Sequence, residues 1–339
     1  MNALASYDNF VFDFYGTLVD IHTEEDSPRL WDELAGFYGC YGAGYTGEEL
    51  HARYDVLVKE QAAALKAASQ RSLPEVELGR VFRALLENAP KKRSAILAAP
   101  AYDGRGGRQT AAFYNSANVR QKRQEAVFGS RRPPKTNADA ARQEALRGFR
   151  RDPWSEAARI CAEGAAGPEN WSEARWEVWT AAVANFFRIA SRRRFSPYPN
   201  TESTLRDLKR AGKHVYLLSN AQSIFTVPEI EAAGLYWYFD DLFISSEQQV
   251  KKPDPSFFAG LIHRHSLQPK RTVMIGNDMS SDMGVAALCG VSGIFLNTDH
   301  FSDEEIAKRL AAMHAETGSK LVPRIIRDGD IGKILVNED

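Results

Sequence analysis

Short apolar runs near both ends of the chain, with long stretches of helical spacing between them, organise the sequence. The first run covers residues 10–14, is interrupted by Asp13 and is followed at once by a Gly16-Thr17 turn. This pattern is typical of a buried parallel strand whose carboxyl end brings one charged side chain to a ligand crevice. For this stretch alone, an ordinary strand whose Asp13 caps a helix is an open alternative.

Between residues 21 and 194 the apolar positions recur at helical spacing. Two sets of such positions lie in residues 50–65 and 76–86, and a third, rich in tryptophan and phenylalanine, lies in residues 171–187. We interpret the third set as the core of a helix bundle rather than as a ligand pocket.

From Pro197 onward, strand and helix patterns alternate. The spacing predicts strands at 213–220, 242–245, 272–276, 293–296 and, at an edge, 324–326, with helices at 201–211, 227–233, 255–265 and 282–289. Such repeats predict an α/β fold with a Rossmann-like, doubly wound parallel sheet. The opening strand has no other partner and must join this sheet. We therefore expect a core of residues 1–20 plus 195–339 and a helical domain of residues 21–194.

The helical domain contains a basic segment at about residues 99–152. Residues 105–151 hold twelve Lys and Arg against three acidic residues, together with Gly-rich and Pro-Pro stretches. This composition predicts a flexible or partly helical insertion. A phosphate- or nucleic-acid-binding arm is the alternative, and sparse aromatic residues and the lack of a recognised nucleic-acid module argue against it.

Composition narrows the class of protein. The chain has 339 residues, 44% of them hydrophobic, and a net charge of −1, which gives no global affinity for nucleic acid or anionic membranes. Its three cysteines are too far apart for a disulfide framework or a zinc site, which favours a reducing compartment. Neither a signal peptide nor a membrane-spanning run is evident, so we expect a cytoplasmic protein. Oligomeric state does not follow from the sequence.

Functional side chains follow four of the predicted strands. They are Asp13, then Ser219-Asn220, then Lys252, then the acidic pair Asp278 and Asp282. Carboxyl ends of parallel strands meet at one edge of a sheet, so these groups are expected to converge. Asp13, Asp278 and Asp282 offer the hard oxygen ligands of Mg²⁺, Ser219 offers an anion contact, and Lys252 offers a neutralising charge. Asp13 could then act as a carboxylate nucleophile.

In these motifs, and over residues 9–20 and 197–339, the chain resembles the haloacid dehalogenase (HAD) superfamily. Asp13 matches the family's nucleophile, Ser219 its second motif, Lys252 its third, and Asp278 with Asp282 its fourth. The resemblance implies a hydrolase core, an aspartyl-enzyme intermediate, Mg²⁺ in most members, and a helical cap inserted after the first motif.

Two positions depart from the family's phosphatases. Tyr15 stands where they carry an aspartate that protonates the leaving group, and Gly276-Asn277-Asp278 puts the first acid of the fourth motif one place late. The first motif, with Tyr15-Gly16-Thr17-Leu18, looks like that of the 2-haloacid dehalogenases, which need neither the acid nor a metal. The acidic pair favours a cation instead. The Tyr15 carbonyl is still available as a ligand, and its phenol or Asp20 is a substitute proton donor.

The sequence therefore predicts a Mg²⁺-dependent phosphatase of a small metabolite, selective for acidic leaving groups. A metal-independent dehalogenase and a non-catalytic binding protein are the alternatives. We assign catalysis to Asp13, Tyr15 and Lys252, substrate binding to Thr17, Ser219 and Asn220, and the metal to Asp13, Tyr15, Asp278 and Asp282. Selectivity is expected from the cap, with Trp171, Arg175, Trp176 and residues 23–25 as candidates.

Overall fold

The computed structural model describes residues 6–69, 72–91 and 168–336. All of them belong to one compact unit. The basic insertion predicted at about residues 99–152 lies outside the described residues, and so does Cys161.

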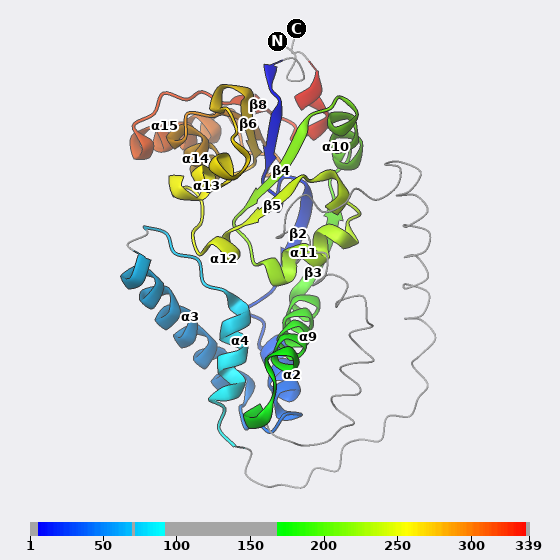
Figure 1. Ribbon diagram of the computed structural model, residues 1–339, viewed down its shortest axis with the longest axis vertical. Coiled ribbons are helices and arrows are strands. Elements are labelled where there is room, and N and C mark those ends of the chain that lie inside the picture. Colours follow the sequence, from blue (N-terminus) through cyan, green and yellow to red (C-terminus); the bar gives the residue numbers. More distant parts are fainter. Residues whose placement is uncertain (1–5, 70–71, 92–167, 337–339) are drawn as a thin grey trace. The chain divides into compact units, whose positions relative to one another are not determined.

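Six parallel strands form the main sheet, in the order β5-β4-β1-β6-β7-β8 (Figure 1). The predicted doubly wound parallel sheet is thereby confirmed, including its edge strand. The opening strand β1 lies inside the sheet, where Phe12 is in register with Leu217 on one side and Ile275 on the other. The bounds are β1 Asn9–Phe12, β4 His214–Ser219, β5 Asp241–Ile244, β6 Thr272–Gly276, β7 Ser292–Leu296 and β8 Arg324–Ile326.

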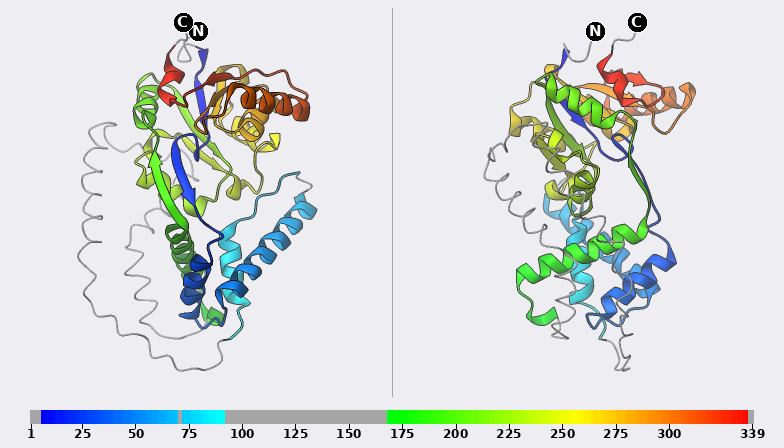
Figure 2. Two further views of the ribbon diagram at one scale, coloured as in Figure 1. Left: turned by 180° about the vertical axis from the view of Figure 1, so that it is seen from behind. Right: turned by 90° about the vertical axis from the view of Figure 1, so that its right-hand side faces the viewer.

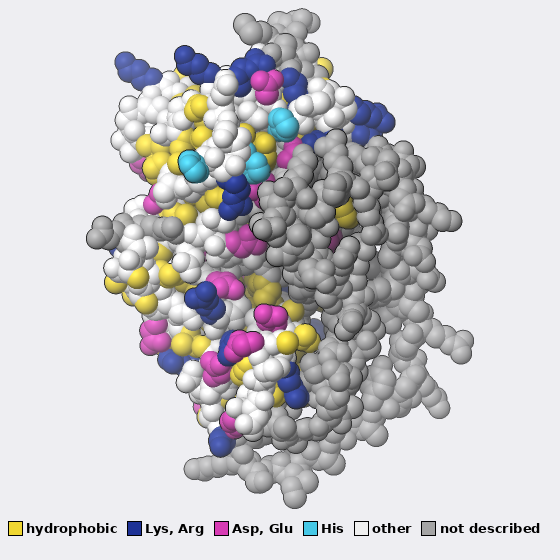
Figure 3. Space-filling model, viewed as in Figure 1, with side chains coloured by type: hydrophobic (Ala, Val, Ile, Leu, Met, Phe, Trp, Pro, Cys, Tyr) yellow, Lys and Arg dark blue, Asp and Glu magenta, His cyan; other side chains and the backbone are white. Residues whose placement is uncertain are grey.

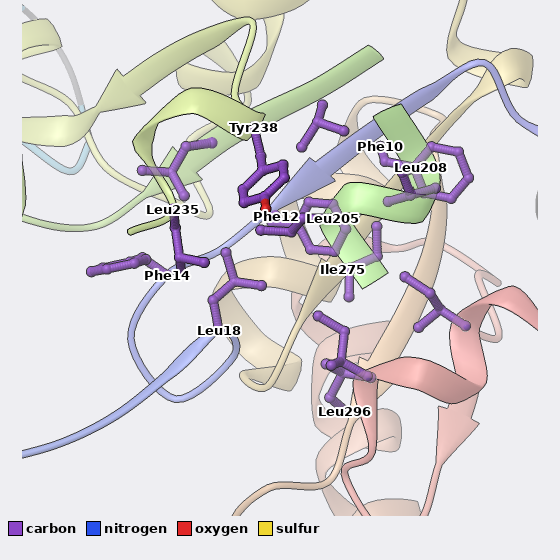
Figure 4. Packing of buried hydrophobic residues seen from close by; sticks show 14 of the residues in the cluster. Phe10, Phe12, Phe14, Leu18, Leu205, Leu208, Leu235, Tyr238, Ile275 and Leu296 are labelled. Atoms are coloured by element: carbon purple, nitrogen blue, oxygen red, sulfur yellow. The ribbon is translucent and has the colours of Figure 1, made fainter. Parts of the chain in front are cut away.

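Alternating side chains of the strands pack against helices on opposite faces of the sheet. Phe10 and Phe12 join a buried cluster with Leu205 and Leu208 of α10 (Figure 4), whereas Val11 joins a second cluster with α13, α14 and α15. A period of two is what a strand buried on both faces requires. The helices are α10 Thr201–Arg210, α11 Ser223–Ala232, α12 Ser245–Gln248, α13 Pro255–His265, α14 Gly284–Leu288 and α15 Asp303–Thr317.

Two predicted helices differ in their starts. Helix α11 begins at Ser223 rather than near Val227, so Pro228 lies inside the helix instead of in its first turn. The additional turn buries Phe225 against the helical region, and Thr226 Oγ1 hydrogen-bonds back to the Gln222 carbonyl. The helix expected from residue 282 begins two residues later, as α14 at Gly284. Residue 282 itself lies in a π-helical turn, η4 Met279–Met283.

The helical region is reached through two antiparallel strands, β2 Val19–Thr23 and β3 Arg192–Pro197 (Figures 1 and 2). Extended structure thus continues three residues past Asp20, because β2 finds its partner in the returning chain. The helices are α2 Pro28–Gly39, α3 Gly47–Ser69, α4 Leu78–Glu87 and α9 Glu173–Ser191. Their apolar faces bury a common cluster, which includes the aromatic stripe of α9. That residues 21–194 form a domain of their own remains a prediction.

Short 3-10 turns complete the elements, and they are η1 Pro168–Asn170, η2 Tyr236–Tyr238, η3 Pro269–Arg271 and η5 Ile331–Leu335. In the part of the chain that is described, no helix has both the length and the apolar character needed to cross a bilayer. On the face shown in Figure 3, acidic and basic side chains of the described residues lie beside one another.

Candidate active site

Asp13 lies immediately beyond strand β1, where its backbone N–H still donates to the Ile275 carbonyl of β6 at 2.9 Å. Its carboxylate is nearly enclosed, with 8% of the residue exposed. Oδ1 accepts hydrogen bonds from Ser219 Oγ at 2.9 Å and from Lys252 Nζ at 2.8 Å. Within the described chain, Oδ2 accepts none. The predicted convergence of Asp13, Ser219 and Lys252 is therefore present.

The ammonium group of Lys252 is buried among three oxygen atoms. It donates to Asp13 Oδ1 at 2.8 Å, to Asp282 Oδ1 at 2.6 Å and to the Leu218 carbonyl at 2.8 Å. These three acceptors use all the donors that an ammonium has. Burial alone would lower the pKa of Lys252, but the two carboxylates raise it overall, so the cation is maintained.

The two acids of the fourth motif occupy different environments. Asp282 is buried, and its Oδ2 accepts from the Asp278 backbone N–H at 3.0 Å. Burial raises the pKa of Asp282 to about 7, although Lys252 lies beside it. Asp278 is exposed, and its Oδ1 caps the following turn by accepting from Ser281 N at 2.6 Å. Asp282 therefore belongs to the site around Lys252, whereas the carboxylate of Asp278 serves the start of η4.

Asn220 fixes the loop that carries Lys252. Its Oδ1 accepts from the Lys252 N–H at 2.7 Å, and its Nδ2 donates to the Lys252 carbonyl at 3.0 Å. This pair of bonds ties the end of β4 to the third motif. The side chain predicted to bind substrate thus also positions the lysine.

The turn after Asp13 is held by the residue that precedes Asp278. Thr17, which is fully buried, donates to Asn277 Oδ1 at 3.2 Å, and Asn277 Nδ2 donates to Asp299 Oδ2 at 3.3 Å. Gly16 has φ 77°, and a Cβ there would lie 2.4 Å from Asn277 Nδ2, so only glycine fits. It is thus Asn277, not Asp278, that faces the first motif.

Tyr15 is part of a buried polar network rather than a free acid. Its hydroxyl lies 2.5 Å from Glu229 Oε2, to which it donates, and 3.0 Å from Thr226 Oγ1. Arg188 of α9 pairs with both oxygens of Glu229 at 2.9 and 3.1 Å and lies over the Tyr15 ring. Burial raises the pKa of Tyr15 well above its ordinary value, and the Glu229 carboxylate raises it further. Arg192 also binds Glu229, at 2.9 Å.

Sequence reasoning did not identify Glu229, Arg188 or Gln222. Glu229 and Glu231 both lie in the helical stretch of α11, so no sequence signal singled out Glu229. The other proposed proton donor, Asp20, is paired with Arg194 at 2.6 Å.

The predicted cap candidates lie in two places. Trp171 and Trp176 pack with each other in the helical cluster, and Arg175 lies over the Trp171 ring. Thr23 and Glu25, in contrast, line a cavity with Tyr15.

The expected magnesium ligands do not fit the ion in this arrangement. Mg²⁺ requires oxygen atoms turned toward one octahedral centre. Both oxygens of Asp282 are taken by Lys252 and the Asp278 N–H, and Asp278 caps a helical turn. Among the residues described, no three acidic, histidine or cysteine side chains converge in a way that could hold a metal ion on their own. Asp13 and the carbonyl of Tyr15 are the remaining members of the predicted set.

Two cavities meet at the loop after β4. Asn220 and Gln222 of this loop line both cavities, and so does Leu78 of α4. One, of about 280 Å³, also contains Tyr15, Arg188 and Glu25. The other, of about 340 Å³, contains Glu75 and Lys251. A small organic molecule fits either volume, and the shared loop directly follows Ser219.

Curated relatives match about a third of the chain. The match to glyceraldehyde 3-phosphate phosphatase of Methanothermobacter thermautotrophicus is 34% identical over 103 residues, 30% of this chain and 46% of that protein. Phosphoserine phosphatase of Thermus thermophilus is 31% identical over 33% of this chain and 44% of its own length. Phosphoglycolate phosphatase of Vibrio cholerae is 31% identical over 32% and 48%. The matches thus span less than half of each relative.

Solved structures that are similar to this chain include dehalogenases and a phosphatase. L-2-haloacid dehalogenase of Xanthobacter autotrophicus has a TM-score of 0.41 at 16% identity, covering 97% of this chain and 98% of its own. A HAD phosphatase of Thermococcus onnurineus has a TM-score of 0.42 at 14% identity, covering 93% and 100%. A model of the haloacid dehalogenase-like hydrolase family matches residues 7–290. With this match over most of its length, the chain belongs to the haloacid dehalogenase-like hydrolases.

Proposed function

We propose that this hydrolase cleaves small phosphorylated metabolites through a covalent intermediate on Asp13. The observation that carries the proposal is the unequal environment of the two carboxylate oxygens. Oδ1 is held by Ser219 and Lys252, while no described residue donates to Oδ2. An oriented carboxylate with one uncommitted oxygen is suited to act as a nucleophile.

In the first step, Asp13 Oδ2 forms a bond to phosphorus as the bond from phosphorus to the leaving oxygen breaks. The leaving group departs with the electron pair. In the second step, water attacks phosphorus, the aspartyl–phosphorus bond breaks, and the products are inorganic phosphate, a proton and the restored carboxylate. Lys252 holds one unit of positive charge beside Asp13 in both steps, which offsets the negative charge that gathers there.

Leaving-group selectivity follows from the state of Tyr15. Its hydroxyl already donates to Glu229, and its pKa is raised by burial, so it is a poor proton donor at neutral pH. General acid catalysis typically contributes about 10²–10⁴-fold, most for poor leaving groups. The carboxylate of an acyl phosphate and the phenolate of an aryl phosphate can leave without a proton, so acyl and aryl phosphates are the expected substrates.

Magnesium was expected from the sequence, but the carboxylates of Asp278 and Asp282 are committed to other partners, and the proposal routes no step through a metal. The positive charge of Lys252 serves as the electrostatic partner of Asp13 instead. The phosphatase names of the relatives favour phosphate over halide as the group acted upon.

The test is hydrolysis of acetyl phosphate and para-nitrophenyl phosphate by the whole chain. We expect turnover of both and its loss in Asp13→Asn, which keeps the shape of the side chain but not the nucleophile. Asp278→Asn is the matched control, because that carboxylate caps a turn outside the site. Equal activity in Asp13→Asn and the parent would overturn the proposal.

A 2-haloacid dehalogenase is the second candidate, and it is favoured by the same unavailable Tyr15 hydroxyl, because halide leaves without a proton. The two reactions differ in the bond that water breaks. An aspartyl ester is opened at its carbonyl carbon, so one turnover of 2-chloropropionate in ¹⁸O-water would label Asp13. An aspartyl phosphate is opened at phosphorus and would label the phosphate instead.

The third candidate is a binding protein without catalysis. It would follow if the chain turned over neither the phosphate compounds nor 2-chloropropionate. The basic insertion at about residues 99–152 would be the contact surface of such a protein, and it lies outside the described residues. A cytoplasmic location likewise stays a prediction.

A further inference from the structure

The larger cavity, of about 340 Å³, has an apolar wall and one carboxylate. Its wall includes Val58 of α3 together with Pro74, Val76 and Leu78, which lead into α4. Glu75 and Lys251 provide its charged groups. A cavity of this kind suits a ligand with a short apolar body and one polar end.

Glu75 is half-buried, and its ion pair with Lys251 is a long one. Its side chain is 18% exposed, yet the Lys251 ammonium lies 3.9 Å away and is itself 43% exposed. The nearer donors are neutral: Gln222 Nε2 at 3.2 Å and Ser245 Oγ at 3.5 Å. Burial raises the pKa of Glu75 despite these partners. A half-buried carboxylate whose counter-ion lies at this distance would be stabilised by a closer cation.

In the other cavity, of about 280 Å³, the charged side chains are closely paired. Its arginine, Arg188, is bound to both oxygens of Glu229, and its Nη1 reaches Glu25 at 3.2 Å. The charges there are already matched within the protein. Glu75 is therefore the carboxylate in these cavities whose counter-ion is the more distant, at 3.9 Å against 3.2 Å for Glu25.

The cavity also adjoins the catalytic loop. Asn220, one of its lining residues, directly follows Ser219, which binds Asp13. Gln222 holds the Glu75 segment against this loop, since its side chain bonds both Val76 O and Leu78 N at 2.8 Å. On this loop, the cavity lining therefore begins at the residue after the serine that binds Asp13.

We infer that this cavity takes an organic cation, a primary ammonium group on a short apolar body, and that Glu75 determines this specificity. That the cation belongs to the leaving group of the substrate rests on the proposed function. Binding of the cation itself does not, so the two claims can be tested apart.

The binding test is calorimetric titration of the whole chain with butylammonium and, for comparison, with 1-butanol. We expect the cation to bind at least about tenfold more tightly than the alcohol, equivalent to ~1.4 kcal/mol. Glu75→Gln should remove the difference. Glu77→Gln is the matched control, because that side chain pairs with Arg80 at the surface. Equal affinity for both compounds in the parent would overturn the inference.

A second variant guards against misfolding of Glu75→Gln. Lys251→Met removes the competing ammonium from a half-exposed side chain, while the Lys251 backbone N–H can still bond to Leu73 O. It should tighten butylammonium binding, and weaker binding would contradict the inference.

The kinetic test compares 4-(aminomethyl)phenyl phosphate with 4-ethylphenyl phosphate, two aryl phosphates that differ by an ammonium in place of a methyl group. The parent should prefer the amine and Glu77→Gln should keep that preference, whereas Glu75→Gln should lose it. Turnover of para-nitrophenyl phosphate without this preference would overturn the inference alone. Glu75-dependent cation binding without Asp13-dependent turnover would overturn the proposed function alone.

Discussion

The hydroxyl of Tyr15 donates a hydrogen bond of 2.5 Å to Glu229, a residue 214 positions further along the chain. This contact joins the first motif to helix α11, and Arg188 extends it to helix α9. The residue that replaces a catalytic acid thus has a structural role. Its proton is committed to a carboxylate and is not available to a departing oxygen.

Tyr15→Phe tests that role. We expect the ratio of kcat/KM for aryl over alkyl phosphates to change less than about threefold, because no proton transfer is lost. Stability in urea should fall by about 1.5–3 kcal/mol, since a hydrogen bond to a charged group disappears. A loss confined to alkyl phosphates, about 10²-fold or greater, would show that the phenol acts as the acid.

Lys252→Met removes the buried cation between Asp13 and Asp282. We expect kcat for acetyl phosphate to fall about 10²–10³-fold, as for other losses of transition-state charge stabilisation. Lys251→Met is the neighbouring control and should retain turnover of this small substrate. Comparable losses in the two variants would indicate a general disturbance of the loop rather than a role for the Lys252 charge.

Removal of metal ions should leave the activity in place. After dialysis against EDTA, we expect acetyl phosphate turnover to stay within about twofold, because both oxygens of Asp282 are already bound by Lys252 and the Asp278 N–H. The measurement is initial rate before and after EDTA and after added Mg²⁺. Loss with EDTA and recovery with Mg²⁺ would mean that Asp282 exchanges Lys252 for the ion.

Asp241 should make stability depend on pH. Burial alone would raise its pKa, but hydrogen bonds from His265 at 2.9 Å and Arg264 at 3.1 Å lower it overall. A lowered folded-state pKa gives stability that is complete above the ordinary aspartate pKa of about 3.9 and is lost as the pH falls through the folded-state value.

Urea unfolding of Asp241→Asn measures this contribution. The variant should be about 1–3 kcal/mol less stable near neutral pH, and the difference should shrink below about pH 4. A difference that stays constant down to pH 3 would assign the loss to packing rather than to charge.

Much of the site could be predicted because it depends on strand ends. Parallel strands bring their carboxyl ends to one edge, so Asp13, Ser219 and Lys252 had to converge once the sheet was recognised. The acidic pair could not be resolved this way. Which of Asn277 and Asp278 faces the first motif depends on where the π-helical turn begins, and two adjacent polar residues give no periodic signal.

The side-chain partners of Tyr15 and Glu75 could not be predicted from the sequence, for a different reason. Glu229 lies on α11 and Arg188 on α9, and both reach Tyr15 only because these two helices pack beside the first motif. Gln222 meets the Glu75 segment over a separation of about 150 residues, as its bond to Val76 spans 146. Hydrophobic patterns predict elements, but not which polar side chains face each other between them.

Trapping the covalent intermediate tests the central claim most directly. A sample quenched during turnover of acetyl phosphate and reduced with borohydride converts a phosphorylated or esterified aspartate into homoserine, which peptide mass spectrometry locates. We predict homoserine at position 13, in amounts that rise with substrate and vanish in Asp13→Asn. Homoserine at another aspartate, or none during measurable turnover, would contradict the assignment of Asp13 as nucleophile.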